Sequence, residues 1–330
     1  MKQYKTLLTI ENNCRNDLKT FYNKLSEKII SSYRGNSQLY HNKDRLINLI
    51  IQPLYDYEEE FRNILLNYQL QAYNQGTSDV KELIDIQGVN LVATKKQLTL
   101  DIFSKPKTII QTKMEDYSII DYLKKPLKNM GVTNIKGFIN LKQHLSQIHK
   151  DKKHLIERKP SEKVKQLLQT NNMKLSTHTR SRITSTIKNI LLKSETRGEN
   201  ARTIGKLIQE QFTKLANYES ERLARTEIIK CHNMAKQDEI TNNELIDYTQ
   251  WISTDDERTR ESHVELNGMI IRVGDVFPNG CQYPGDPNGD AEEVVNCRCT
   301  IVPYIPEIGM IAPPDMTCFT ESDFIPITSN

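Results

Sequence analysis

The feature that most constrains the fold is an apolar repeat, at steps of three and four residues, that runs through residues 177–240. Side chains at such steps share one face of an α-helix. Gly198 interrupts the repeat, so the sequence predicts one long helix before it and another after it. The apolar positions are Ile183, Ile187, Ile190 and Leu191 before the break, and Ile204, Leu207, Ile208, Phe212 and Leu215 after it.

The second predicted helix continues with a narrow stripe of small and medium-sized side chains. Ala224, Ile228, Cys231 and Ala235 form this stripe. Cysteine outside a disulfide or a metal site behaves as a small apolar residue. We therefore expect Cys231 to be a core residue.

Residues 1–75 also favour helices. One apolar series comprises Leu18, Phe21, Tyr22, Leu25, Ile29 and Tyr33. A second run covers residues 45–73, in which Pro53 should kink or split the helix. The following segment, residues 75–79, reads Gln-Gly-Thr-Ser-Asp and predicts a helix stop and then a cap for a short helix.

The next part of the chain is less regular. Short strands are possible within residues 87–112, where Pro106 would interrupt them. Residues 115–129 and 137–157 have helical patterns. Ser161 then follows Pro160 and predicts the cap of the next helix.

The pattern changes after residue 244 from helical to β. Residues 248–253, 269–273 and 299–304 predict strands, separated by loops rich in Gly, Pro, Asn and Asp. The tail after Pro306 has three further prolines and is expected to be extended. The predicted fold class is α+β, with a mostly helical N-terminal two thirds and a small loop-rich β unit near the C-terminus.

A sharp charge division follows nearly the same boundary. Residues 101–236 contain 28 Lys and Arg against 13 Asp and Glu, a net charge of +15. Residues 237–330 contain four Arg, no Lys and 18 Asp and Glu, a net charge of −14. The basic part could bind the phosphate backbone of DNA, or it could simply be the solvated surface of lysine-rich helices.

Membrane and secretory classes are disfavoured. No run reaches the ~18–20 apolar residues of a membrane span, and the first residues lack the apolar core of a secretory signal. We expect a protein that is made and kept on the cytosolic side, without a membrane partner. The six cysteines are too few and too scattered for a disulfide scaffold.

The most informative segment begins at Trp251. It continues as Asp256-Glu-Arg258-Thr-Arg260 and reaches His263 and then Gly268. After a gap come Tyr-Pro-Gly-Asp at residues 283–286 and Asn-Cys-Arg-Cys at residues 296–299. Clustered Arg and His side chains need nearby carboxylates, and the candidates are Asp255, Asp256, Asp286, Glu292 and Glu293.

This ordered set resembles the C-terminal domain of phage head morphogenesis proteins, the minor head proteins similar to protein F of phage Mu. The preceding helix fits through Leu-Ala-Arg-Thr-Glu at residues 223–227 and through Asn233. The resemblance divides the chain into an unassigned helical region, residues 1–170, a head morphogenesis domain, residues 171–305, and the tail, residues 306–330. The motif and interaction residues are Arg225, Thr226, Glu227, Trp251, Asp256, Arg258, Arg260, His263, Gly268, Asn296 and Arg298.

The resemblance implies a non-enzymatic virion component inside the head of a tailed virus or provirus, present in the host cytoplasm during assembly. It implies the portal and other head proteins as partners and a part in head morphogenesis and DNA packaging or ejection. DNA could bind the basic region, residues 101–236. The alternative is a metal-dependent nuclease, with His263 as general base, or a toxin-type enzyme carried on a head-protein domain. A cellular DNA-binding protein is a third possibility.

A structural zinc site is possible but is not the leading expectation. Cys297 and Cys299 are two residues apart, and with His263 and Cys281 they would make a three-Cys, one-His ligand set. The alternatives are a structural pair of thiols and a disulfide. Among single residues, Trp251 is expected to anchor the core of the β unit, and Gly268 and Gly285 to occupy turns that need a positive φ. Arg225 and Glu227 are expected to dock their helix on the acidic β unit by charge.

Overall fold

The computed structural model describes residues 2–39, 42–97, 160–243, 246–254, 256–306 and 310–326. Residues 1–86 and 160–330 form one compact unit, to which the contacts below belong, and residues 87–159 form a second. The predicted helices at 115–129 and 137–157 lie outside the described residues. The fold is α+β, as predicted, with long N-terminal helices and a small antiparallel sheet near the C-terminus.

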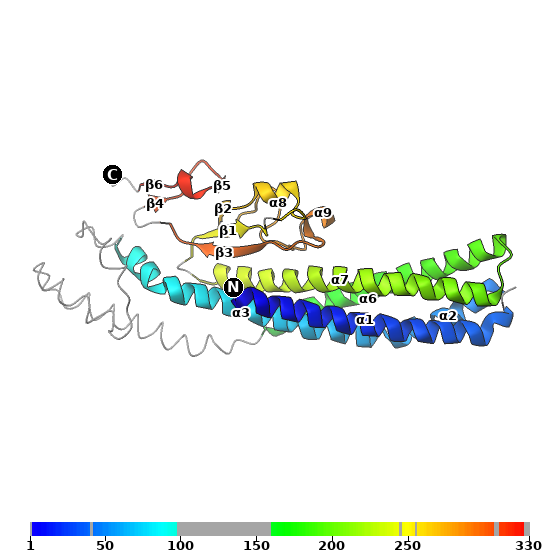
Figure 1. The fold of residues 1–330 in the computed structure, drawn as a ribbon. Coiled ribbons are helices and arrows are strands. Elements are labelled where there is room, and N and C mark those ends of the chain that lie inside the picture. Colours follow the sequence, from blue (N-terminus) through cyan, green and yellow to red (C-terminus); the bar gives the residue numbers. More distant parts are fainter. Residues whose placement is uncertain are drawn as a thin grey trace, which may run out of the picture. The chain divides into compact units, whose positions relative to one another are not determined.

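The long helices surround a shared apolar core. α1 packs along α7, and α2 packs against α1 and α6 (Figure 1). The predicted apolar series of α1 and α7 are buried there, as is Cys231. The helix bounds are α1 Lys2–Asn36, α2 Lys43–Asp56, α3 Glu58–Gln97, α6 Glu162–Thr196 and α7 Ala201–Thr241, with a short 3-10 turn at Ser37–Leu39. The predicted division at residue 170 falls inside α6.

Several helix ends lie where the sequence predicts them. Pro53 stands in the last turn of α2, which ends at Asp56. The backbone N–H of Val164 donates to Ser161 Oγ (3.3 Å) at the start of α6. Gly198 has a φ of +64° and separates α6 from α7, whose first turn is capped by Asn200. These positions show local backbone chemistry deciding where helices stop.

Two predictions for α3 are wrong. The helix does not stop at residues 75–79, and residues 87–97 are helical instead of forming strands. Gly76 is a contact residue and not a terminator, because a Cβ at this position would lie 2.2 Å from the backbone oxygen of His232 in α7. A short apolar run such as Val89, Leu91 and Val92 does not distinguish strand from helix by its pattern alone.

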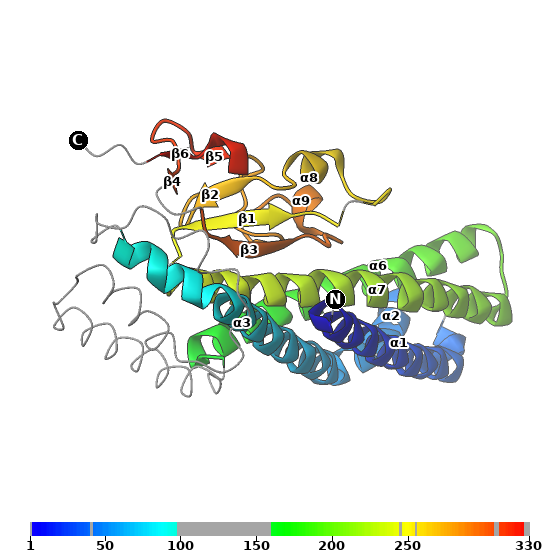
Figure 2. The ribbon, with the colours of Figure 1, turned by 60° about the vertical axis from the view of Figure 1, so that its left-hand side comes forward.

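The three predicted strands are adjacent in a four-stranded antiparallel sheet in the order β3-β1-β2-β5. They are β1 Tyr248–Ile252, β2 Ile270–Arg272 and β3 Thr300–Tyr304. Trp251 is paired with Ile301, and Gln250 with Ile270. β3 is the strand that lies against α7 (Figure 2). Two short helices, α8 Glu261–Glu265 and α9 Ala291–Val294, lie in the connections.

The sequence predicted an extended tail, but the structure shows a tail that folds into short strands. β5 Cys318–Phe319 adds to the edge of β2, and β4 Met310–Ile311 pairs with β6 Ile325–Pro326 around a 3-10 turn at Glu321–Asp323. Phe319 and Phe324 pack with Tyr248, at ring-centroid distances of 5.7 and 5.2 Å. These aromatic contacts give the proline-rich tail enough apolar burial to fold back on the sheet. None of the described helices is long and apolar enough to cross a membrane.

Candidate functional site

The β unit is joined to α7 through a buried asparagine. Asn233 is fully buried. Its Nδ2 donates to the backbone oxygens of Pro284 and Cys299, both at 3.0 Å, and its Oδ1 accepts a hydrogen bond from Thr300 Oγ1 (2.8 Å). A buried amide with partners on two separate loops fixes their positions relative to the helix.

Lys236, one turn further along α7, extends this junction. Its Nζ donates to Thr300 Oγ1 (2.9 Å) and to the backbone oxygen of Ile301 (3.3 Å). Burial lowers the pKa of Lys236 to about 8. Gly285, with the predicted positive φ (+87°), allows its loop to approach the same helix, since a Cβ there would lie 2.9 Å from Lys230 Cα.

Docking by the charges of Arg225 and Glu227 is not observed. Arg225 pairs with Glu11 of α1 (3.3 Å), and Glu227 accepts a hydrogen bond from Gln69 of α3 (2.9 Å) and pairs with Lys230 (2.7 Å). These two side chains therefore hold helices together. They lie on the sides of α7 that face α1 and α3, so the acidic β unit is out of their reach.

Thr226, between them, does contact the β unit. Its Oγ1 accepts a hydrogen bond from the backbone N–H of Asn296 (3.1 Å). Asn296 has a φ of +59°, a conformation that asparagine tolerates better than most residues. The asparagine of the Asn-Cys-Arg-Cys segment thus turns the chain immediately before Cys297.

Trp251 occupies the centre of the β unit, as predicted, and is 1% exposed. Its ring packs edge-on against His263 and Phe277, with centroid distances of 5.3 and 5.1 Å. Gly268, at a φ of +82°, donates its backbone N–H to the backbone oxygen of Trp251 (2.9 Å). Gly268 is therefore hydrogen-bonded to the backbone of Trp251, and the Trp251 ring is the surface against which His263 packs.

His263 faces two sulfur atoms and one carboxylate. Its Nδ1 lies 3.6 Å from Cys297 Sγ and 3.4 Å from Cys299 Sγ. Its Nε2 lies 2.8 Å from Glu293 Oε2. The three ligand-type atoms, Nδ1 and the two Sγ, lie within 4.8 Å of one another, and all three residues are buried. We refer to His263, Cys297 and Cys299 as the His-Cys cluster.

Neighbouring polar groups fix the position of this cluster. Glu293 also accepts hydrogen bonds from Ser262 Oγ (3.2 Å) and Asn279 Nδ2 (3.3 Å). Ser253 Oγ donates to the backbone oxygen of His263. Glu293 was a candidate carboxylate from the sequence, but its pairing with His263 could not be deduced because 29 residues of loop and strand separate them.

The proton affinities within the cluster are strongly perturbed. The hydrogen bond from Cys297 and the nearby His263 outweigh burial and lower the pKa of Cys299, while the same contact and burial raise the pKa of Cys297. Burial tends to lower the pKa of His263, but Cys299 and Glu293 outweigh it, so this pKa is raised. Free of any ion, the cluster therefore favours a Cys299 thiolate beside a protonated imidazole.

Cys281 is not a member of the cluster, contrary to the predicted set of four ligands. It is buried nearby, where its Sγ would lie 2.3 Å from a Cβ on Gly289. Among the described residues, the group that could hold a metal ion comprises His263, Cys297 and Cys299 alone. Spacing in the sequence could not show this, because the loop at 281–289 directs the thiol toward its own backbone.

The arginines of the motif hold loops in place. The guanidinium of Arg298 pairs with both carboxylate oxygens of Asp256 and keeps the pKa of that carboxyl well below its usual range. Arg260 donates to the backbone oxygen of Val295. The backbone N–H of Arg258 donates to Asp256 Oδ1 (3.0 Å), and its side chain is exposed. The acidic candidate Asp286 instead accepts hydrogen bonds from the backbone of its own loop.

The segment that contains these residues matches a known protein family. Residues 185–302 match the family of phage Mu protein F like proteins. This part of the chain is similar to phage Mu protein F like proteins. The resemblance inferred from the sequence is therefore confirmed. The match begins within α6, includes all of α7 and ends in β3, so it covers the junction between α7 and the β unit.

Two curated proteins are similar to the chain. One is the uncharacterized protein YqbB of Bacillus subtilis (strain 168), which is 23% identical over 140 residues, 40% of this chain and 44% of that protein. The other is the NAD(+)--arginine ADP-ribosyltransferase EFV of Enterococcus faecalis (strain ATCC 700802 / V583), 27% identical over 135 residues, 39% of this chain and 28% of that protein. The alignments thus cover less than half of either relative. No solved structure matches the chain significantly.

Proposed function

We propose that the chain is a minor head protein of a tailed virus or provirus, which assists head morphogenesis and the packaging or ejection of DNA near the portal. The observation that carries this proposal is the match of residues 185–302 to the phage Mu protein F-like family. In this proposal the protein resides inside the virion head, with the portal and other head proteins as its partners.

The contacts of the family motif support a structural role. Asn233 and Thr226 position the β unit on α7, while Gly268, Arg298 and Arg260 hold strands and loops within the β unit. Side chains that are occupied in this way hold one domain in a single shape. A rigid domain of this kind suits a fitting within a larger assembly.

The same contacts argue against a nuclease that uses His263 as general base. His263 is 1% exposed, and its ring nitrogens face Glu293 and two sulfurs. A general base must reach its substrate directly or through one water molecule. Asn267, four residues after His263, accepts a hydrogen bond from the backbone of Ser253 (3.0 Å).

The toxin-type alternative is favoured only by the name of the enterococcal relative, of which 28% is aligned. Transfer of ADP-ribose from NAD⁺ to an arginine acceptor by the purified chain would support this alternative. Plasmid nicking in the presence of Mg²⁺ or Mn²⁺, abolished in His263→Ala, would support the nuclease.

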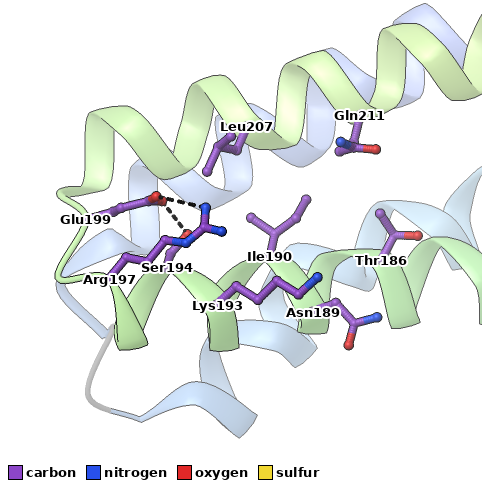
Figure 3. Close-up of a pocket in the computed structure, with 9 residues that line it drawn as sticks. All are labelled: Thr186, Asn189, Ile190, Lys193, Ser194, Arg197, Glu199, Leu207 and Gln211. Atoms are coloured by element: carbon purple, nitrogen blue, oxygen red, sulfur yellow. Dashed lines mark hydrogen bonds and ion pairs between the residues drawn. The ribbon is translucent and has the colours of Figure 1, made fainter.

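The basic region offers a surface for DNA. In its described part, residues 160–236, several exposed cations lie on α6 and α7 with no carboxylate partner among the described side chains, and these include Lys188, Lys193 and Lys206. Lys193 and Arg197 also line a pocket of about 340 Å³ between the two helices (Figure 3). Arg197 pairs with Glu199 there (3.8 Å). We propose that this end of the α6–α7 hairpin contacts the phosphate backbone.

Particle composition tests the proposal. The chain is expressed together with the portal, scaffold and coat proteins that this proposal expects to be encoded beside its gene, and particles are purified and analysed by mass spectrometry. We expect the chain in procapsids at a low copy number relative to the coat protein. A matched expression without the portal should reduce its incorporation. Procapsids that assemble normally and lack the chain would contradict the proposed function.

A further inference from the structure

The His-Cys cluster is more organised than a pair of core thiols requires. A buried histidine whose only task is packing needs one hydrogen-bond partner for each nitrogen. Here one ring nitrogen, Nδ1, faces two sulfur atoms, while the other is bonded to a carboxylate that itself has further donors. Nitrogen and thiolate sulfur are the preferred ligands of zinc.

The distances fit tetrahedral coordination. With a Zn–N bond of about 2.05 Å, a Zn–S bond of about 2.3 Å and a tetrahedral angle, nitrogen and sulfur ligands lie about 3.6 Å apart. The Nδ1 of His263 lies 3.6 Å from Cys297 Sγ and 3.4 Å from Cys299 Sγ. The two nitrogen–sulfur distances are therefore already close to those that a shared ion would impose.

Glu293 selects the nitrogen that would bind. Its carboxylate lies 2.8 Å from Nε2, so Nε2 carries a proton and Nδ1 is left to face the sulfurs. A carboxylate on the second nitrogen of a ligating histidine is the usual outer partner in zinc sites. Asn279 and Ser262 in turn hold Glu293.

We propose that His263 Nδ1, Cys297 Sγ and Cys299 Sγ bind a zinc ion, with Glu293 as the orienting partner of the imidazole. One Zn²⁺ takes the place of the protons that the three ligand atoms would otherwise carry, which leaves two thiolates and a neutral imidazole around the ion. The two thiolates and the neutral imidazole then neutralise the ion, which suits a buried position. Cys281 is not a ligand in this site.

Such an ion would join parts of the β unit that are far apart in the sequence. His263 belongs to α8, and the two cysteines immediately precede β3. The turn at Asn296, which is anchored to Thr226 of α7, presents Cys297 to the cluster. Zinc would therefore tie α8, the start of β3 and, through that turn, the long helix α7.

Metal content of the full chain tests this assignment. The protein is purified without a metal-affinity tag or chelator, and zinc is measured by inductively coupled plasma mass spectrometry. We expect about one zinc per chain in the wild type and in Cys281→Ser, and less than about a tenth in Cys297→Ser and Cys299→Ser. Cys281 is a suitable control because it is an equally buried thiol of the same β unit.

Cobalt substitution covers the case in which the cysteine variants do not fold. Wild-type protein stripped of zinc and loaded with Co²⁺ should gain a thiolate-to-cobalt absorption band of two-thiolate intensity. Glu293→Gln should still bind, with an affinity about 10–100-fold lower. A wild type that neither retains zinc nor gains this band overturns the proposal. Loss of zinc from Cys281→Ser overturns the three-ligand set.

Discussion

Trp251 combines the largest buried side chain of the β unit with an unpaired polar group. Its indole N–H is buried and has no hydrogen-bond partner among the described residues. Such a group destabilises the folded state, so the ring must be retained for its packing against His263 and Phe277. The tryptophan shapes the cluster beside it as well as the core.

Replacing Trp251 by alanine should therefore lower the free energy of unfolding by roughly 3–5 kcal/mol, because a large cavity opens beside His263. Urea denaturation followed by circular dichroism measures the change. Trp251→Phe is the matched control, since it preserves most of the apolar volume and removes the unpaired N–H. A loss below about 1 kcal/mol in Trp251→Ala would show that the ring does not carry the core.

Because burial lowers the pKa of Lys236, the stability of the fold should depend on pH. This pKa is about 8 in the fold against an ordinary 10.5, so between these values the unfolded chain binds more protons. The free energy of unfolding of the wild type should rise with pH across this window, relative to Lys236→Met, by up to about 3 kcal/mol. Denaturation series at pH 7.5 to 10.5 measure it, and parallel curves for the two proteins would contradict the prediction.

At the same scale, the sequence could identify residue types better than pairings. His263, Cys297 and Cys299 were placed together from their spacing and chemistry, whereas Cys281 was included wrongly. The predicted docking of Arg225 and Glu227 on the β unit was also wrong, because the sequence does not show which neighbouring element each side of α7 faces. Contacts across long loops depend on loop conformation, which no local pattern specifies.

At the scale of elements, apolar periodicity correctly predicted the long helices, whereas glycine did not reliably predict where a helix ends. Gly198 ends a helix, as predicted, while Gly76 lies in the middle of one. The two cases look alike in sequence, since each glycine has polar neighbours. They differ in tertiary packing, because only Gly76 lies against the backbone of another helix.

Gly76→Ala should consequently lower the free energy of unfolding by about 1–3 kcal/mol, although alanine is the better helix former. The added methyl group would meet the backbone oxygen of His232 at 2.2 Å, and backbone cannot move aside easily. Gly35→Ala in α1 is the matched control, because nothing lies within 4 Å of its Cβ position. Thermal unfolding measures both, and equal effects would refute the close approach of α3 and α7.

At the scale of the whole molecule, the charge division predicted two parts with different partners. In the structure, α7 belongs to the basic region and carries the acidic β unit on uncharged groups such as Asn233 and Thr226, together with Lys236. The contacts between the β unit and α7 therefore do not use the exposed cations of α6 and α7.

These cations should give the full chain a salt-dependent affinity for DNA. Binding of a labelled duplex, measured by fluorescence anisotropy between ~50 and ~200 mM salt, should weaken steeply as counterions are released. Changing Lys188, Lys193 and Lys206 to Gln should lower the affinity and flatten the salt slope. Changing Lys5, Lys19 and Lys28 of α1 to Gln should not, and equal effects of the two sets would exclude a specific basic surface.

Helix α7 contacts both the N-terminal helices and the β unit. This has a consequence for how genes of this kind can exchange segments. Glu11 of α1 and Gln69 of α3 lie outside the family match, yet they satisfy Arg225 and Glu227 within it. A chimera cut at residue 185 would replace Glu11 and Gln69, leaving Arg225 with Glu221 and the buried Glu227 with Lys230 as their remaining ion-pair partners. The N-terminal helices must therefore be inherited together with the domain, or replaced by others that supply an acid and an amide at the same two places.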